Sequence, residues 1–284
     1  MLKINLSKNI GFCFGVERAV KIAEELLNEN KSVYITGDLI HNEEEMERLE
    51  KMGLKTLNIN DDDWPDLSNS TVVIRAHGVP LHVLDKLRER ANKVVNATCP
   101  VVSNVANLMR RERENGFEIV LFGREGHAEV EYLRSCVENV KVVSLEKNVP
   151  NVESQKIALF SQTTMDTEGF RKFAKHLLDS MKNFSDFHVH NTICSVTVER
   201  EEEVKRLAKS NDVCIVVGGR KSSNAKKLYE IAKALNENSY MILNANELKE
   251  KWFTSAKNVG ICSGTSTPQR AIEGVVKRLK NFKN

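Results

Sequence analysis

Three cysteines recur at one kind of position along the chain, and this repeat constrains the fold more than any other feature. Each follows a short apolar run (KINL, KVVN or FHVHN) and opens a helical pattern: Cys13, Cys99 and Cys194. A strand pattern then ends in glycine 24 residues after each cysteine: Gly37, Gly123 and Gly218. Such internal similarity indicates three related units stacked or arranged around a common centre.

Polar side chains follow the same repeat. The residues 28 positions after the cysteines are His41, His127 and Ser222, and those 30 positions after them are Glu43, Glu129 and Asn224. A second strand ends in a polar residue 64 positions on, at His77 and Thr163, and an eight-residue insertion makes Ser266 their counterpart in the third unit. Because α/β folds bind ligands beyond their strand ends, these side chains predict a shared binding site.

The chain alternates short apolar strand patterns such as VCIVVGG with amphipathic helical patterns such as ERAVKIAEELL. This alternation predicts an α/β fold with parallel, buried strands. We expect three related α/β lobes in a pseudo-threefold cloverleaf around a central metal cluster. The predicted lobes are 14–98, 99–193 and 194–284, and residues 1–13 add an N-terminal strand, LKINL, to the sheet of the third lobe.

The amino-acid composition limits the classes of partner that the chain can be expected to bind. The net charge is +3 with acidic and basic residues interleaved, which is typical of an ordinary surface and not of a nucleic-acid-binding protein. No apolar run approaches the ~20 residues of a membrane span, and no secretory leader pattern opens the chain. We therefore expect a cytoplasmic protein that binds neither nucleic acid nor membrane.

The six cysteines are too sparse for a disulfide scaffold and contain no C-x-x-C pair. Any metal site must therefore be assembled from distant segments. We expect Cys136, Cys214 and Cys262 to be structural. Three converging thiolates could hold zinc, but structural zinc usually takes a fourth protein ligand, whereas a 4Fe-4S cluster on three thiolates keeps one iron open. The chemistry favours the cluster.

The strand ends around such an iron offer mainly hydrogen-bond donors. Imidazoles, hydroxyls, an amide and helix N-termini together form a site suited to a polyanion such as a diphosphate. The run GGRKSSNAKK contributes glycines and cations, but it lacks the Walker pattern and is weak evidence by itself.

Nine motifs in this order resemble the 4-hydroxy-3-methylbut-2-enyl diphosphate reductase (LytB/IspH) family. They are GFCFGVERAV, HN at 41–42, RAHGV at 75–79, ATCP at 97–100, GHAEVE at 126–131, SQTT at 161–164, IC at 193–194, SSN at 222–224 and GTSTP at 264–268. The resemblance runs from residue 9 to about 280. It implies reductive dehydration of an allylic diphosphate to isopentenyl and dimethylallyl diphosphate, the last step of the methylerythritol phosphate route to isoprenoids.

The resemblance also implies roles for individual residues. Cys13, Cys99 and Cys194 match the ligands of an oxygen-sensitive 4Fe-4S cluster. The diphosphate contacts match His41, His77, His127, Ser222, Ser223, Asn224 and Ser266. Glu129 matches the proton source, and Thr163 matches the residue that orients the substrate hydroxyl. An electron donor such as ferredoxin or flavodoxin is also implied, whereas Glu43 has no implied role.

Two other functions are compatible with part of this pattern. A non-redox hydratase or dehydratase would use the open iron only as a Lewis acid, and its turnover would need no electrons. A non-catalytic iron-sulfur sensor or electron carrier would not need a ring of anion-binding groups beside the metal. The ring of His, Ser and Asn side chains argues against the sensor.

Overall fold

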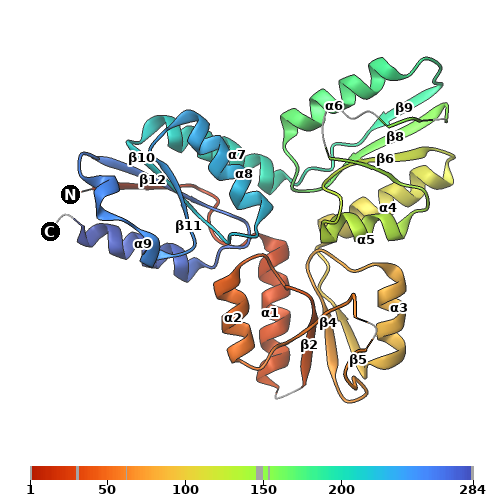
Figure 1. Cartoon of the computed structure of the whole chain (residues 1–284), viewed down its shortest axis with the longest axis horizontal. Helices are drawn as coiled ribbons and strands as arrows, with labels where there is room; N and C mark the ends of the chain where they lie inside the picture. The colour runs from red at the N-terminus through yellow and green to blue at the C-terminus, as the bar shows by residue number, and fades with distance from the viewer. Residues whose placement is uncertain (1, 30–31, 62, 145–149, 153, 283–284) are drawn as a thin grey trace. The chain divides into compact units, whose positions relative to one another are not determined.

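The computed structural model describes residues 2–282 apart from 30–31, 62, 145–149 and 153. Residue 1 and residues 283–284, at the outer limits of the predicted third lobe, lie outside the described residues. The described chain forms three four-stranded sheets in which every pair of neighbouring strands is parallel (Figure 1). The predicted α/β class is therefore confirmed.

The three sheets share one strand order. The first is β3-β2-β4-β5, formed by β2 (Val33–Thr36), β3 (Lys55–Leu57), β4 (Thr71–Ile74) and β5 (Lys93–Asn96). The second is β7-β6-β8-β9, formed by β6 (Glu118–Phe122), β7 (Lys141–Val143), β8 (Lys156–Ser161) and β9 (Asp186–Val189). The third is β11-β10-β12-β1, formed by β10 (Val213–Val217), β11 (Ser239–Ile242), β12 (Asn258–Ser263) and β1 (Lys3–Leu6).

β1 occupies in the third sheet the edge position that β5 and β9 occupy in the others. Lys3 to Leu6 pair in parallel with Asn258 to Ile261, so the predicted pairing of LKINL with the third sheet is confirmed. Each of these three edge strands is the last strand or helix before one of the repeated cysteines. The repeat in the sequence is thus a repeat of strand, cysteine and helix.

Helices connect the parallel strands, as crossover connections require. They are α1 (Phe14–Asn28), α2 (Glu43–Lys51), α3 (Leu81–Arg90), α4 (Pro100–Glu114), α5 (Ala128–Cys136), α6 (Thr167–Ser180), α7 (Ser195–Ser210), α8 (Ser223–Leu235) and α9 (Gln269–Asn281), with short 3₁₀ turns η1 (Ala245–Glu247) and η2 (Glu250–Phe253). Cys13, Cys99 and Cys194 each directly precede a helix, α1, α4 and α7.

Burial explains which runs became central strands. All five residues of β10 (VCIVV) are buried, and so are five of the six residues of β8 (KIALFS) and of β12 (NVGICS). The edge strands β1, β5 and β9 have no fully buried residue. Central parallel strands covered by helices on both faces read as continuous apolar runs, as these do.

Packing divides the described chain into two compact regions. The terminal region comprises 1–17, 40–52 and 195–284, and so holds the third sheet together with α2. The central region comprises 18–39 and 53–194 and holds the first two sheets. The lobe limits near residues 14, 99 and 194 stay predictions.

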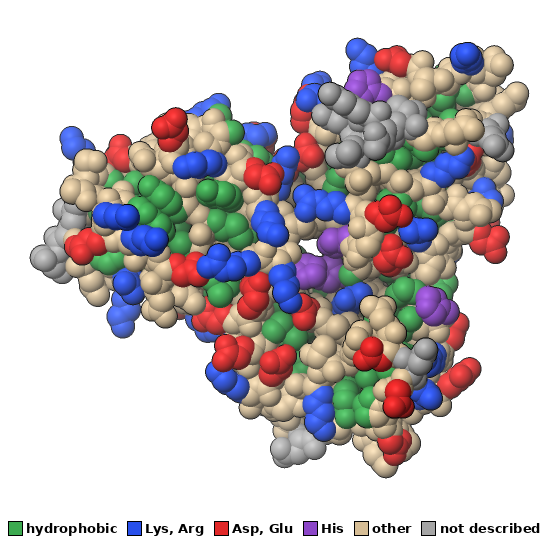
Figure 2. Space-filling model, viewed as in Figure 1, with side chains coloured by type: hydrophobic (Ala, Val, Ile, Leu, Met, Phe, Trp, Pro, Cys, Tyr) green, Lys and Arg blue, Asp and Glu red, His purple; other side chains and the backbone are tan. Residues whose placement is uncertain are grey.

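The charged side chains of the surface are mixed in sign. Figure 2 shows basic and acidic side chains interleaved over the visible face. No helix among the described residues is long and apolar enough to cross a membrane.

Candidate functional site

The backbones of the three repeated cysteines are held by the same kind of hydrogen bond. Each backbone N–H donates to the carbonyl of the second residue after a central strand: Cys13 to Thr265 (3.0 Å), Cys99 to Ala76 (2.9 Å) and Cys194 to Thr163 (2.9 Å). None of the three side chains is in a disulfide, and all three are partly exposed. We call these three places the cysteine junctions. Cys13 lies in the terminal region and the other two lie in the central region, and the convergence of the three sulfurs stays a prediction.

The remaining thiols lie elsewhere. Cys214 and Cys262 are buried inside β10 and β12, as their apolar sequence context predicts, and Cys136 ends α5. A hydrogen bond with Cys214 and, next to it, burial raise the pKa of the Cys262 thiol well above its usual range. Cys262 is therefore a protonated thiol, and both residues are buried in the core, as a structural role requires.

The repeated glycines close equivalent turns. Their N–H groups donate to the last residue of the neighbouring strand: Gly37 to Leu57 (3.0 Å), Gly123 to Val143 (2.8 Å) and Gly218 to Ile242 (2.9 Å). A helix begins a few residues later in each unit, and its N-cap side chain accepts a backbone N–H: Asn42, His127 and Ser222. The side chains near these helix starts are thereby fixed in place.

In the first unit, two residues that match the other units by spacing in the sequence are one residue away from the structural counterparts. His127 and Ser222 cap their helices 28 residues after a cysteine, but His41 at that spacing precedes its cap, Asn42. The bond from Cys99 likewise makes Ala76, and not His77, the counterpart of Thr163. In the third unit the corresponding bond from Cys13 identifies Thr265 in place of Ser266. The expected alignment of strand ends was therefore wrong by one residue in each of these units.

A buried carboxyl group lies at the Cys194 junction, in the central region. Glu129 is 1% exposed, and its two oxygens accept from Thr163, Oε1 from the backbone N–H (2.7 Å) and Oε2 from the hydroxyl (2.8 Å). Burial raises the pKa of Glu129 to about 7, although the two bonds from Thr163 lower it in part. The group can therefore gain or lose a proton near neutral pH.

Two imidazoles lie beside this carboxyl. His127 Nδ1 accepts the backbone N–H of Glu129 (3.2 Å), so the neutral ring carries its proton on Nε2 as a donor. The rings of His77 and His127 meet edge to face with centroids 5.6 Å apart. The central region therefore brings together four of the predicted site residues, His77, His127, Glu129 and Thr163.

The terminal region gathers another set of predicted residues. Ser266 Oγ donates to the carbonyl of His41 (3.1 Å), and Asn224 Oδ1 accepts the backbone N–H of Thr265 (3.1 Å). Ser222 Oγ accepts the N–H of Ala225 (3.2 Å) at the start of α8, whose first residue is Ser223. His41, Ser222, Ser223, Asn224 and Ser266 thus all lie in this region.

Gly219 allows the close approach within this set. A side-chain carbon at position 219 would lie 2.4 Å from the carbonyl oxygen of His41, which is too close for any other residue. The same loop is held by Glu43, whose oxygens accept the N–H groups of Arg220 and Lys221, each at 3.2 Å. Glu43 therefore holds the loop before Ser222, a role that the sequence did not predict.

Arg200 is a buried structural residue that the sequence motifs did not predict. It is 3% exposed, and its guanidinium donates to the carbonyls of Ser263 and Gly11, both at 2.7 Å. These bonds tie the segment before Cys13 to the end of β12. A signal existed, since Arg200 lies on the face of α7 that carries Thr197, Glu201 and Val204 at helical spacing, all of them buried.

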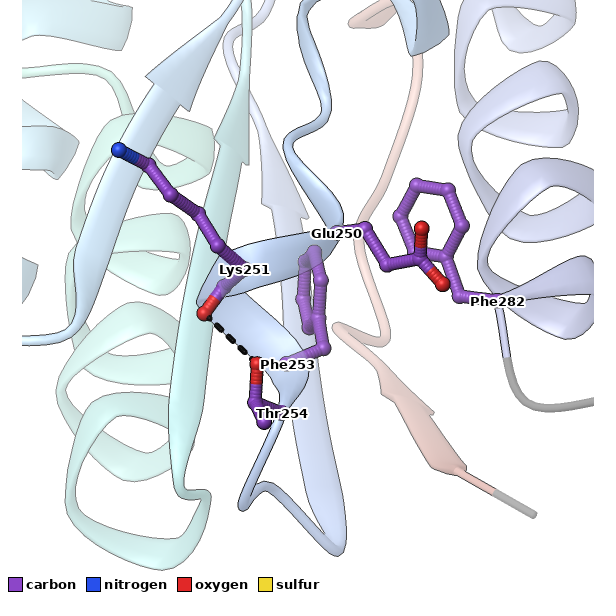
Figure 3. Close-up of a pocket in the computed structure, with 5 residues that line it drawn as sticks. All are labelled: Glu250, Lys251, Phe253, Thr254 and Phe282. Atoms are coloured by element: carbon purple, nitrogen blue, oxygen red, sulfur yellow. Dashed lines mark hydrogen bonds between the residues drawn. The ribbon is translucent and has the colours of Figure 1, made fainter.

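A hollow of about 430 Å³ in the terminal region is lined by Glu250, Lys251, Phe253, Thr254 and Phe282. Figure 3 shows these side chains around η2 and the end of α9, where the Thr254 hydroxyl donates to the Lys251 carbonyl (3.3 Å). The predicted site residues are not among those that line it. The cysteine junctions and their polar neighbours therefore remain the candidate site.

Comparison with known proteins gives one consistent result. The sequence model of the LytB protein family matches residues 4–280. The chain is 41% identical to the 4-hydroxy-3-methylbut-2-enyl diphosphate reductase of Campylobacter hominis, over 99% of this chain and 100% of that one. It is 42% identical to the reductase of the same name from Campylobacter concisus, over 98% and 99%.

Solved structures agree. A structure described as (E)-4-hydroxy-3-methyl-but-2-enyl diphosphate reductase, the terminal enzyme of the non-mevalonate pathway, matches at 37% identity and a TM-score of 0.71, covering 99% of both chains. The structure of E-1-hydroxy-2-methyl-but-2-enyl-4-diphosphate reductase from Plasmodium falciparum matches at 24% identity and a TM-score of 0.86, covering 99% of this chain and 88% of that one. The second match supports the fold.

Proposed function

The chain belongs to the LytB protein family and catalyses the reduction of 4-hydroxy-3-methylbut-2-enyl diphosphate, the terminal step of the non-mevalonate pathway, and we propose that the cysteine junctions and their polar neighbours form its active site. The observation that carries this proposal is the threefold junction. Three cysteines that form no disulfide each have their backbone fixed by the same kind of bond, between the end of a strand and the start of a helix.

The junctions fit the iron-sulfur cluster that the family uses. Cys13, Cys99 and Cys194 are partly exposed thiols outside the cores, and none of the three is in a disulfide. We propose that they hold a 4Fe-4S cluster through three thiolates, as the resemblance implies. When bound, the cluster supplies electrons and a Lewis acid for the departing hydroxyl of the substrate.

The substrate diphosphate has a complementary set of donors. The polar residues His41, Ser222, Ser223, Asn224 and Ser266 lie in the terminal region, and we propose that His77 and His127 of the central region belong to the same set. His127 and Ser222 cap the N-termini of α5 and α8, where backbone N–H groups and the helix dipole favour an anion. These seven residues are proposed to bind the diphosphate.

Glu129 is proposed to deliver the proton that leaves with the hydroxyl oxygen. Hydroxide is a poor leaving group at neutral pH, so the departing oxygen needs an acid. Burial raises the pKa of Glu129 to about 7, so this side chain can carry and release a proton near neutral pH, as an efficient general acid requires. Protonated Glu129 can donate to Thr163 Oγ1, which frees the threonine hydroxyl to orient the hydroxyl of the substrate.

The electrons must come from a partner, for which we propose a ferredoxin or a flavodoxin. The first test is anaerobic purification with iron and sulfide analysis, followed by turnover with a reduced dye. Turnover should cease when the reductant is omitted. A substrate that loses water without any reductant would contradict a reductive site.

The ligand assignment has its own test. Single Cys→Ser changes at the three junctions should remove or cripple the cluster, because a hydroxyl is a poor substitute for a thiolate. Cys136→Ser is the matched control and should keep its iron and colour. Full anaerobic iron content in all three junction variants would contradict the assignment.

A further inference from the structure

A second group of metal-ligating side chains lies in the central region, on the outer part of the second sheet. It consists of Glu112 in the last turn of α4, His188 in the edge strand β9, and His190 just after that strand. We infer that these three residues, the edge site, bind a divalent transition-metal ion of the zinc type. The function proposed above does not use them.

The three ligand atoms already converge. His188 Nδ1 lies 3.1 Å from both carboxylate oxygens of Glu112, and His190 Nε2 lies 2.8 Å from Oε1. All three candidate ligand atoms lie within 4.8 Å of one another. The two histidines project to one face because they are two residues apart along an extended segment, and His190 N–H still donates to Leu159 O (2.8 Å) of β8. The sheet therefore sets their spacing.

Both imidazole rings are held by aromatic neighbours. The His188 ring stacks on Phe117 with centroids 4.3 Å apart, and the His190 ring stacks on Phe160 at 4.6 Å. Phe160 is fully buried in β8, so its ring is part of the rigid core. Ligands whose side-chain positions are fixed before binding lose less conformational entropy when the ion arrives.

The donor set suits zinc in its chemistry. Two imidazoles and one carboxylate are a known three-ligand set for Zn²⁺, with the remaining positions taken by water. His188 is 45% exposed, so an ion and its water can reach the site from solvent.

An ion at the edge site would act as a brace between two cysteine junctions. α4 begins directly after Cys99, and the chain reaches Cys194 four residues after His190. The ion would join the last turn of α4 to the strand that leads to Cys194. The inferred role is structural, and the ion takes no part in the reduction.

The test uses the cluster-loaded chain, prepared anaerobically and freed of loosely held metal with a chelator. Isothermal titration with Zn²⁺ should show one bound equivalent. His188→Asn, His190→Asn and Glu112→Gln should each weaken this binding by about 10- to 100-fold, the usual effect of losing one ligand or its support. His82→Asn, which removes an exposed histidine on α3, is the matched control and should bind as the unchanged chain does.

X-ray absorption at the zinc edge of the unchanged chain separates this site from the cysteines. A nitrogen and oxygen shell at about 2.0 to 2.1 Å without sulfur is expected, because a thiolate would add a shell near ~2.3 Å. A sulfur shell would overturn the inference, as would full Zn²⁺ affinity in both histidine variants. The absorption result does not depend on whether the variants fold, and the iron cluster reports separately on the cysteine junctions.

Discussion

The second and third cysteine-repeat units build the same junction with different chemistry. In the central region Glu129 accepts the backbone N–H of Thr163 (2.7 Å), and in the terminal region Asn224 accepts that of Thr265 (3.1 Å). Both acceptors are the second residue of their helix, after the caps His127 and Ser222. A carboxyl that can release a proton stands at one junction, and a neutral amide stands at the other.

This difference shows how a repeated scaffold can carry an unrepeated function. The backbone needs only an oxygen acceptor at the helix start, and either side chain supplies it. The identity of the acceptor is then free to serve chemistry. At the Glu129 junction burial raises the pKa of the carboxyl to about 7. Asn224 instead offers an amide, which bears no charge that could repel a bound anion.

The largest expected effect comes from making the acidic junction resemble the amide one. Glu129→Gln keeps an oxygen for the Thr163 N–H and an NH₂ group that can donate to its hydroxyl, so the junction should stay folded. The variant should keep its iron and its substrate affinity but lose about 10² to 10⁴ in kcat, the usual worth of general acid catalysis. Iron content, substrate affinity and kcat should be measured together under anaerobic conditions.

The outcomes of that experiment separate the roles. An unchanged kcat would exclude Glu129 as the acid. Lost iron would mean that Glu129 supports the cluster. Glu131→Gln, two residues further along α5 and partly exposed, is a suitable control and should leave kcat unchanged.

A second test uses the pH dependence of stability. The pKa of Glu129 rises from 4.5 to about 7 on folding, so the folded chain binds this proton more tightly than the unfolded chain does. Its contribution to the free energy of unfolding is therefore greatest below about pH 4.5, falls as the pH rises to about 7 and then levels off. The fall amounts to about 3 kcal/mol, at ~1.4 kcal/mol per pH unit.

The Gln variant should lack this fall because its amide does not titrate. Unfolding by denaturant should be followed for both proteins from about pH 5 to 8, and their difference in free energy isolates Glu129 from the other groups. The unchanged chain should lose stability relative to Glu129→Gln as the pH rises. Parallel curves across that range would show that Glu129 has an ordinary pKa.

The repeat, the α/β class and the third-sheet position of LKINL could all be predicted from the sequence, because they depend on period and apolar pattern. The exact counterparts could not. The spacing matches His77 to Thr163, and an eight-residue insertion matches Ser266 to it, yet the bonds from Cys99 and Cys13 select Ala76 and Thr265. One added or missing residue in a loop changes the spacing but not the hydrogen bond, and only coordinates show the bond.

The reciprocal change tests the amide junction. Asn224→Asp keeps an oxygen for the Thr265 N–H but places a negative charge where the diphosphate is proposed to bind. Repulsion between like charges of ~1 to 3 kcal/mol should raise KM by about 5- to 150-fold. The effect on kcat should be smaller, because this side chain is not the proposed acid.

Asn224→Ala separates charge from the lost hydrogen bond. It removes the acceptor without adding charge, so it should raise KM less than the aspartate does. Steady-state kinetics at low and high salt would measure both, and the aspartate penalty should shrink as salt screens the charge. An unchanged KM in Asn224→Asp would place the diphosphate elsewhere.

The smallest expected effect comes from Glu43, which has the same spacing from its cysteine as Glu129 but a different helix position. Glu43 opens α2, and its two oxygens hold the N–H groups of Arg220 and Lys221, just before Ser222 and Ser223. Glutamine has a single oxygen acceptor, so Glu43→Gln should release one of these groups. Water can replace the lost bond because both bonds are exposed, and the cost should be about 1 kcal/mol or less.

This cost should appear as a rise in KM of up to about five-fold with kcat unchanged, because the loop would position the serines less firmly. Glu44→Gln is the matched control: it removes the same charge from the same helix end, but Glu44 accepts a long 3.5 Å bond from Asn244 and does not hold the loop of Arg220 and Lys221. An equal rise in both variants would assign the effect to the helix dipole. A large fall in kcat in Glu43→Gln alone would instead mean that the first unit carries an acid of its own, and Glu129 would then not be the only carboxyl that the repeat puts to use.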